Sequence, residues 1–195
     1  KSTLGRLICG LYPPASGAIM VDGLDSRQYP PRILRSVFRY VGQDSELFSG
    51  SIKENLTLGA AKSDPEHMMA VLRKSGADQF LARDAVGFDR LAGERGARLS
   101  GGQRSFLVLA RALMSPFKLL YLDEPTGAMD VQTERQFIDH LKNALEPDQT
   151  LVISTHRQAI LSIVDRIIVM DQGRIVADGP RDEILSRVGN GEKLP

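Results

Sequence analysis

Leu99-Ser100-Gly101-Gly102-Gln103 opens the stretch that decides the fold, and Leu119-Leu120-Tyr121-Leu122-Asp123-Glu124 closes it. Apolar residues recur with helical spacing after the glycines, so a helix is expected to begin at the Ser-Gly-Gly sequence. Free backbone N–H groups at a helix start can bind anions. The continuous apolar run at 119–122 is typical of a buried parallel strand. Asp123 and Glu124 therefore fall at the carboxyl end of a strand, where open α/β sheets bind ligands.

The composition indicates one domain of ordinary size with a substantial core. The 195 residues are 42% hydrophobic, and 25 basic residues nearly balance 24 acidic ones, so no overall charge indicates a nucleic-acid partner. The one cysteine, Cys9, excludes an internal disulfide, and its apolar neighbours predict a buried thiol. No apolar stretch of about 20 residues occurs, so any membrane role requires another segment or chain.

Strands and helices alternate over most of the chain, which predicts a parallel sheet. Strands are expected at residues 18–21, 39–41, 119–122, 150–154 and 166–170, the last with a hairpin partner at 174–177. Helices are expected after Lys1-Ser2-Thr3 and at residues 30–37, 131–145, 158–163 and 181–188, followed by a mobile tail at 189–195.

The strand signals stop between residues 44 and 114, which predicts a mostly helical insertion. Helices are expected there at residues 51–58, 65–74 and 77–83, ahead of the helix that follows Gly102. Asp64 stands where an N-cap is expected, because Pro65 follows it, and Gly76 is a plausible helix stop.

Taken alone, each motif has a structural explanation: Ser-Gly-Gly is usually a turn, and a histidine after a strand is usually structural. Their order along the chain is more specific. With Lys1-Ser2-Thr3 at the start, Gln43 after strand 39–41 and His156 after strand 150–154, the chain closely resembles the nucleotide-binding domain of ABC transporters. The resemblance covers nearly all of residues 1–195, and residues 99–103 match the family's signature sequence residue for residue.

The resemblance implies an α/β fold: a P-loop NTPase core with a mostly parallel sheet and, at 44–114, an inserted helical subdomain. Lys1-Ser2-Thr3 matches the end of the phosphate-binding pattern G-x-x-x-x-G-K-[ST], whose glycines would precede Lys1. We therefore expect the domain to be truncated at its N-terminus. Without the backbone N–H donors of that loop, the chain as given is expected to bind ATP weakly.

Phosphoryl transfer from ATP requires charge neutralisation, Mg²⁺ and a positioned water. In the phosphate-binding pattern, Lys1 would contact the β- and γ-phosphates, the Ser2 hydroxyl would ligate Mg²⁺, and Thr3 completes the motif. Asp123 would hold the metal through its water shell, because Mg²⁺ dehydrates reluctantly. Glu124 would orient or deprotonate the attacking water.

Further roles come from the resemblance alone. Gln43 matches the glutamine that contacts Mg²⁺ and couples to the transmembrane partner, and His156 matches the switch histidine near the γ-phosphate. The family dimerises head to tail, so a second nucleotide-binding domain would complete each ATP site. Across that dimer, Ser100, Gly101 and Gly102 of one subunit would face the nucleotide held by the other. Gln103 and Asp130, which matches the family's D-loop aspartate, are further residues expected to bind nucleotide.

Two residues depart from the family's usual pattern. Gly42 stands where a proline often precedes the glutamine, and Gly127 stands where serine is usual in the loop that contains Asp130. The second departure leaves the contacts of that loop open.

The loop at residues 93–96 resembles the segment by which exporter-type domains contact a transmembrane domain, in the same or a separate chain. With Gln43-Asp44 and Leu47-Phe48, it is most similar to bacterial type I protein-secretion exporters, whose partners include membrane-fusion and outer-membrane channel proteins. Such a domain works at the cytoplasmic face of the inner membrane. Lipid, drug and peptide exporters share most of these segments.

Two other classes of function remain as alternatives. A non-transport ATPase of the chromosome-maintenance or DNA-repair type shares the signature, but it carries a very long coiled coil where this chain has a short insertion. A non-catalytic binding module would fit the missing phosphate-loop glycines, whereas Glu124 and His156 favour an active parent protein.

Overall fold

The computed structural model describes residues 1–60, 62–81 and 86–189. The chain divides into two compact units: residues 2–155, and residues 156–195 together with Lys1. Residues 82–83 of the helix expected at 77–83 lie outside the described residues, as does the tail beyond residue 189. Every helix in the described ranges is too short or too polar to cross a lipid bilayer.

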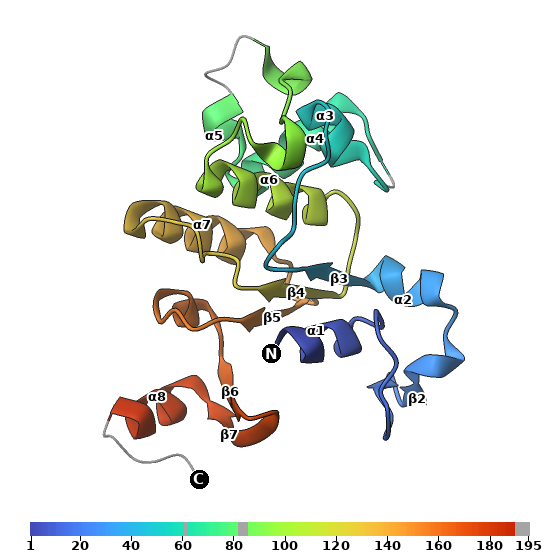
Figure 1. The fold of residues 1–195 in the computed structure, drawn as a ribbon, viewed down its shortest axis with the longest axis vertical. Coiled ribbons are helices and arrows are strands. Elements are labelled where there is room, and N and C mark those ends of the chain that lie inside the picture. The colour runs from blue at the N-terminus through green and yellow to red at the C-terminus, as the bar shows by residue number, and fades with distance from the viewer. Residues whose placement is uncertain (61, 82–85, 190–195) are drawn as a thin grey trace. The chain divides into compact units, whose positions relative to one another are not determined.

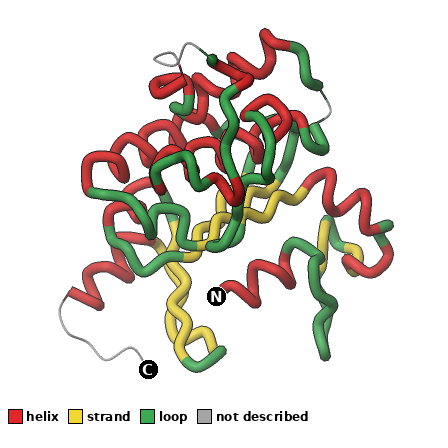
Figure 2. The backbone as a smooth tube through the Cα atoms, turned by 45° about the horizontal axis from the view of Figure 1, so that its top comes forward, coloured by secondary structure: helices red, strands yellow, loops and turns green. Residues whose placement is uncertain are grey.

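The unit of residues 2–155 is built on a parallel sheet of three strands, which confirms the predicted parallel sheet for strands 39–41, 119–122 and 150–154 (Figure 2). The strands predicted at 18–21 and 166–170 lie outside this sheet and pair in antiparallel hairpins instead. The strands lie in the order β3 (Phe38–Val41), β4 (Leu119–Asp123) and β5 (Thr150–Ser154). Tyr40 of β3 lies opposite Tyr121 of β4, and Asp123 lies opposite Ser154 of β5. The carboxyl ends of the three strands therefore share one edge of the sheet.

Helices cover both faces of this sheet, which explains why its central strand is continuously apolar. Helix α1 (Ser2–Ile8) lies on one side of the strands, and α6 (Gly101–Leu113) with α7 (Val131–Ala144) lies on the other (Figure 1). Leu120 and Leu122 of β4 are buried as a result. Cys9 is buried beyond the end of α1, where burial raises the pKa of its thiol to about 11, so the predicted structural thiol is confirmed.

The regular secondary structure of the described residues between β3 and β4 is helical, apart from an isolated bridge between Ser51 and Leu91. The α-helices that precede α6 are α3 (Ile52–Thr57), α4 (Pro65–Ser75) and α5 (Asp78–Leu81), and the short 3₁₀ helices are Gly87–Asp89 and Glu94–Gly96. The predicted Asp64 cap and Gly76 stop are both present, because Asp64 accepts a hydrogen bond from His67 N and Gly76 is left-handed. The assignment of residues 44–114 to a subdomain of their own stays a prediction.

The remaining elements of this unit precede the sheet. They are the antiparallel pair β1 (Met20–Val21) and β2 (Leu24–Asp25), a 3₁₀ turn at Ser26–Gln28, and α2 (Pro31–Val37). Asp22 and Gly23 join the pair with φ angles of 49° and 79°, as a type I′ hairpin turn requires.

The unit of residues 156–195 is described by itself. It contains a 3₁₀ helix at Ala159–Ile163, the antiparallel hairpin of β6 (Arg166–Asp171) and β7 (Arg174–Pro180), and α8 (Arg181–Gly189). The hairpin is a two-stranded sheet of its own. The Arg166 guanidinium donates to both carboxylate oxygens of Asp178 across it, at 2.7 and 2.9 Å. The helix expected at residues 158–163 is present, but it is a single 3₁₀ stretch rather than an α-helix.

Candidate functional site

Three of the predicted site residues lie at the carboxyl edge of the sheet. Asp123 ends β4 and is only 2% exposed, Glu124 follows it half-buried, and Gln43 stands exposed two residues after β3. We call Gln43, Asp123 and Glu124 the carboxylate edge. Its position agrees with the rule that open parallel sheets bind ligands beyond their carboxyl ends.

The two carboxylate oxygens of Asp123 differ in their surroundings. The Tyr40 hydroxyl donates a hydrogen bond to Oδ2 at 3.2 Å. Oδ1 is buried and has no hydrogen-bond partner among the described residues. A buried carboxylate oxygen without a partner is costly, so the site calls for a cation or a bound water.

The donors around Asp123 fit Mg²⁺. Among the described residues, no three His, Cys, Asp or Glu side chains form a cluster that could hold a metal. A cation at Oδ1 would then be coordinated mostly by water and phosphate oxygens, which is how Mg²⁺ is usually held in nucleotide sites. Ser2 and Gln43 are the other side chains of this unit that the sequence assigns to the metal.

The backbone at Glu124 is held in an uncommon conformation. Its φ of 50° lies in the left-handed region, which residues other than glycine seldom adopt. The Glu124 N–H donates to the Ser154 carbonyl at 2.8 Å, and the Glu124 carbonyl accepts from Gly127 N at 3.1 Å. Strained residues of this kind cluster at functional sites, and here two backbone bonds fix the direction in which the side chain leaves the strand.

A pair of tyrosines supports the carboxylate edge, and sequence reasoning missed it. The rings of Tyr40 and Tyr121 stack with centroids 5.5 Å apart. Tyr121 and Asp123 are two residues apart on one strand and so share a face of the sheet. The pair could be found only from the register of β3 against β4, which sets Tyr40 opposite Tyr121.

Helix α1 packs against this pair. A Cβ atom added to Gly5 would lie 2.3 Å from a ring carbon of Tyr121, so only glycine allows this approach. Ser2 and Thr3 begin the same helix, with Ser2 half-buried and Thr3 exposed. The helix that carries the predicted metal-ligating serine is therefore seated directly on the strand that carries Asp123.

The start of α6, residues 100–103, forms a second site, which we call the signature helix start. Ser100 is its N-cap: Gln103 N donates to the Ser100 hydroxyl at 3.2 Å, and Ser100 N donates to the Gln103 side chain at 3.1 Å. This reciprocal capping box explains locally why the helix begins here. Ser100 is exposed and Gly102 is buried.

The glycines of the signature helix start let it approach the beginning of α7. A Cβ atom on Gly102 would lie 2.7 Å from the Thr133 methyl carbon, and one on Gly101 would lie 3.2 Å from the Ala128 carbonyl oxygen. The two segments border a groove of about 450 Å³, which both Ser100 and Asp130 line. The structure thus brings together the two regions that the resemblance assigns to the partner's nucleotide.

Asp130 is the N-cap of α7. Its Oδ1 accepts from the backbone N–H groups of Gln132 and Thr133 at 3.0 Å each, and its Oδ2 accepts from the Thr133 hydroxyl at 2.6 Å. The Thr133 hydroxyl, followed by the backbone N–H groups, holds the pKa of Asp130 below its usual range. The loop before α7 is also bonded to the helix by a contact that the sequence did not predict. The buried Thr126 hydroxyl donates to Glu134 at 2.7 Å.

Lys1 and His156 belong to the other compact unit, and both are exposed. His156 stands two residues after β5, where the sequence places it. The predicted site residues therefore fall into separate groups. Within residues 2–155, Asp123 and Glu124 lie together at the carboxyl edge of the sheet, and the signature helix start lies with Asp130 at another place.

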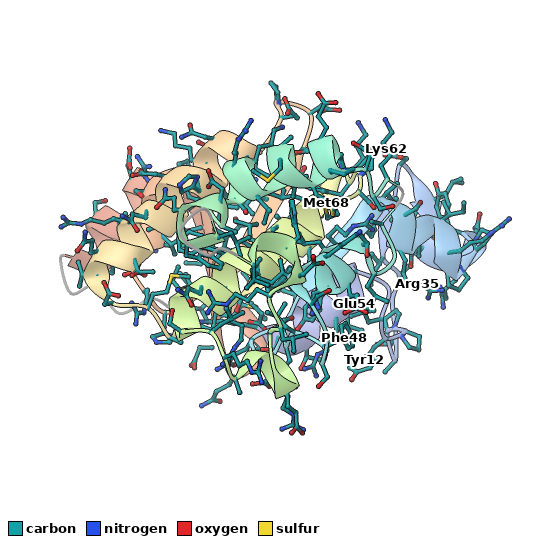
Figure 3. The ribbon with its side chains drawn as sticks, turned by 90° about the horizontal axis from the view of Figure 1, so that it is seen from above. Tyr12, Arg35, Phe48, Glu54, Lys62 and Met68 are labelled. Carbon is teal, nitrogen blue, oxygen red and sulfur yellow. The ribbon has the colours of Figure 1, made fainter. Side chains whose placement is uncertain are left out.

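An arginine-rich groove of about 820 Å³ lies beside the segment that follows Gln43. We call it the arginine groove. The described residues that line it include no acidic side chain, whereas Phe48 and Leu58 in its lining are 57% and 58% exposed. Figure 3 labels Arg35 and Phe48, which come from separate segments of the chain. The arginines that line it are Arg32, Arg35, Arg39 and Arg111.

The loop at residues 93–96 is tied to the same segment. The Arg95 guanidinium forms an ion pair with Glu46 at 3.2 Å, and Arg111 donates to the Glu46 carbonyl at 3.0 Å. Arg95 has a φ of 51° between two left-handed glycines. The exporter-like loop and the residues after Gln43 are thus connected through one glutamate.

Comparison with known proteins gives consistent matches. The family description "ABC transporter" matches residues 1–127. The β-(1→2)glucan export ATP-binding/permease protein NdvA of Brucella abortus is 36% identical over 194 residues, which are all of this chain and 32% of that protein. The mycobactin import ATP-binding/permease protein IrtB of Mycolicibacterium smegmatis is 38% identical over 194 residues, again all of this chain and 34% of that protein.

Among solved structures, a bacterial Atm1-family ABC exporter with ATP bound superimposes with a TM-score of 0.89 at 33% identity. The match covers 96% of this chain and 33% of that chain. The chain thus spans about a third of the length of the relatives that it matches.

Proposed function

The chain belongs to the ABC transporter family and has the α/β ABC ATPase fold, and we propose that it is the ATP-hydrolysing domain that powers transport across a membrane. One observation carries the proposal: the buried Asp123 carboxylate, whose Oδ1 has no hydrogen-bond partner among the described residues, stands next to the strained Glu124 at the carboxyl end of β4. This pair supplies a place for a hydrated cation and, beside it, a base for water.

The proposed role of each residue follows from its position. When bound, Mg²⁺ supplies charge neutralisation at the β- and γ-phosphates. Asp123 holds its water shell, with the Ser2 hydroxyl and the Gln43 side chain as further ligands. Glu124 takes a proton from the attacking water. The water oxygen bonds to the γ-phosphorus as the bond between that phosphorus and the β–γ bridging oxygen breaks, which leaves ADP and phosphate.

The remaining residues of the predicted set act on the nucleotide. Lys1 contacts the β- and γ-phosphates, Thr3 lies beside Ser2 in the same motif, and His156 contacts the γ-phosphate. A second ATPase domain, arranged head to tail, offers its signature helix start and Asp130 to the same nucleotide. The exposure of Ser100 and the groove that it shares with Asp130 support this role.

The direct test is the rate at which variants of the full-length protein hydrolyse Mg-ATP. Asp123→Asn keeps the size of the side chain but removes its charge, so hydrolysis should fall by about 100-fold or more. Asp148→Asn makes the same chemical change at an exposed ion pair with Lys118 and should leave the rate unchanged. An Asp123→Asn variant that hydrolyses Mg-ATP at the wild-type rate would contradict the proposal.

Transport, rather than DNA maintenance, is supported by the segment between β3 and β4. Its longest described helix, α6, has only 13 residues, and no coiled coil is built from the described part of it. The relatives are ATP-binding/permease proteins, which supports a transmembrane domain as partner and a position at the cytoplasmic face of the inner membrane.

The cargo has two candidates. The exporter-like loop at residues 93–96 supports type I protein secretion, with membrane-fusion and outer-membrane channel proteins as further partners. The relatives, a glucan export protein and a mycobactin import protein, support a small molecule or a saccharide instead. Deletion of the gene, followed by measurement of secreted proteins and of extracellular glucan, separates the two: loss of one class identifies the cargo.

The arginine groove is the proposed contact with the transmembrane domain, and its occupant is a cytoplasmic segment with acidic side chains. Four arginines and no acidic side chain among the described lining residues favour a partner with negative charge, and the exposed Phe48 offers an apolar anchor. Arg35→Glu should uncouple transport from ATP hydrolysis. Arg174→Glu, an exposed arginine of the β6–β7 hairpin, should not.

A further inference from the structure

Tyr40 lies where one hydroxyl can control a carboxylate on the neighbouring strand. The β3–β4 register sets Tyr40 opposite Tyr121, and Asp123 lies two residues further along β4. The Tyr40 hydroxyl donates to Asp123 Oδ2 at 3.2 Å, while Oδ1 is buried without a hydrogen-bond partner among the described residues. One oxygen is therefore engaged, and the other is left for a ligand.

The hydroxyl of Tyr40 is the donor in its bond to Asp123. A protonated phenol donates to an ionised carboxylate, which can only accept. The bond thus has one direction and fixes Oδ2 as the Asp123 oxygen that faces Tyr40.

The stacking partner of Tyr40 touches α1. Gly5 of this helix packs against the Tyr121 ring, which stacks on the ring of Tyr40. Ser2 begins this helix. The two tyrosines therefore connect the helix that carries Ser2 with the strand that carries Asp123, the two elements that would ligate one cation.

We propose that Tyr40 is a positioning residue for the Mg-nucleotide site: its hydroxyl fixes the rotamer of Asp123 so that Oδ1 is presented to the hydrated cation. The ring, through its stacking on Tyr121, keeps α1 at a constant distance from β4. This inference rests on the proposed function, because it assigns Asp123 to the metal. It goes beyond that function by giving the metal site a support that contacts neither metal nor nucleotide.

The first test measures metal binding without turnover. Mn²⁺ replaces Mg²⁺, and its affinity for the full-length protein with a non-hydrolysable ATP analogue is measured by electron paramagnetic resonance. Tyr40→Phe keeps the stacked ring and removes only the hydroxyl. Loss of a hydrogen bond to a metal ligand lowers metal affinity about 10–100-fold. The bond here is long for two oxygens, so we expect about a 10-fold loss.

Tyr29→Phe is the matched control. Its hydroxyl donates to the Val21 carbonyl at 3.1 Å, away from β4, so this variant also loses one phenol hydrogen bond. It should bind Mn²⁺ like the wild type. Equal Mn²⁺ affinity in Tyr40→Phe and the wild type overturns the inference but leaves the proposed function intact. A wild type that binds no Mn²⁺ with the nucleotide analogue overturns the proposed function itself, and the inference with it.

The second test separates positioning from stability. In Tyr40→Phe, the Mg²⁺ concentration for half-maximal hydrolysis should rise about 10-fold, while kcat at saturating Mg²⁺ returns close to the wild-type value. A purely structural role would lower the melting temperature without moving the Mg²⁺ dependence. An unchanged Mg²⁺ dependence together with a lower melting temperature therefore also overturns the inference.

Discussion

The carboxylate edge and the signature helix start are both parts of the proposed ATP site, yet they are held in opposite ways. Asp123 is buried, its Oδ2 accepts a hydrogen bond from Tyr40 of β3, and α1 packs against Tyr121, two residues earlier on β4. Ser100 is exposed, and its hydroxyl and backbone N–H are satisfied within its own first helical turn. The first region depends on long-range packing, and the second on local capping. Substitutions in the first should therefore change chemistry and folding, whereas substitutions in the second should change association.

The largest effect is expected for Glu124→Gln. Glutamine keeps the size of the side chain and still hydrogen-bonds water, but it cannot accept the proton, so hydrolysis should slow by about 10²–10⁴-fold. ATP binding should survive, because Asp123 and Ser2 remain, so the variant should accumulate as an ATP-bound dimer. A turnover assay and size-exclusion chromatography with Mg-ATP measure both effects. A variant that turns over normally, or one that stays monomeric, removes Glu124 from this role.

The packing beneath the carboxylate edge is tested by Gly5→Ala. The added Cβ atom would lie 2.3 Å from the Tyr121 ring, so the ring or α1 must shift, and overpacking of this kind costs about 1–3 kcal/mol of unfolding free energy. Gly127→Ala is the control, because its Cβ atom would meet only the Glu124 carbonyl oxygen at an ordinary 3.4 Å. Urea unfolding of the two variants compares them; equal stabilities would show that α1 is not seated tightly on β4.

Two substitutions at Ser100 separate capping from association. Ser100→Ala loses the N-cap bond to Gln103 N and should cost about 1 kcal/mol of unfolding free energy. Ser100→Asp keeps a cap of similar quality, so its stability should stay near that of the wild type. Its negative charge would face the partner's phosphates in the proposed dimer, so ATP-dependent dimerisation should be lost. Normal dimerisation of Ser100→Asp would count against an intermolecular role for the signature helix start.

The smallest effect concerns Asp130. Its pKa is lowered in the folded state, first by the Thr133 hydroxyl, so its contribution to stability is present above the ordinary value of about 4 and is lost as the pH falls through the lowered folded-state pKa. Thr133→Val removes that hydroxyl and should raise the pKa of Asp130 towards the ordinary value. Carboxyl-carbon NMR titration of both proteins measures the shift, and identical titration midpoints would show that the hydroxyl does not hold the carboxylate.

The comparison also explains which parts of the site could be predicted from the sequence. The signature helix start was predictable because its cap, glycines and periodic apolar face are consecutive in the chain. The same holds for the Asp64 cap and the Gly76 stop of α4, which follow local rules. Asp123 and Glu124 could be assigned to a strand end because the preceding residues are continuously apolar.

The supports of the carboxylate edge could not be predicted, because they depend on the register between strands that lie about 80 residues apart, as the separation of Tyr40 and Asp123 shows. A slip of one residue would turn Tyr40 to the other face of the sheet. The contact of Gly5 with Tyr121 likewise requires the packing of α1 to be known. The arginine groove draws its lining from α2, the segment after β3 and the end of α6, which no local pattern brings together.

In the proposed dimer, one ATP site combines the carboxylate edge of one copy with the signature helix start of another. Mixing two inactive variants of the full-length protein tests this arrangement directly. Glu124→Gln retains a normal Ser100, and Ser100→Asp retains a normal Glu124. In a head-to-tail dimer of the two variants, one of the two sites receives the normal residue from each copy. We expect the mixture to hydrolyse ATP at a rate well above the sum of the rates of the two variants assayed separately. Hydrolysis by the mixture no greater than that sum would contradict this arrangement.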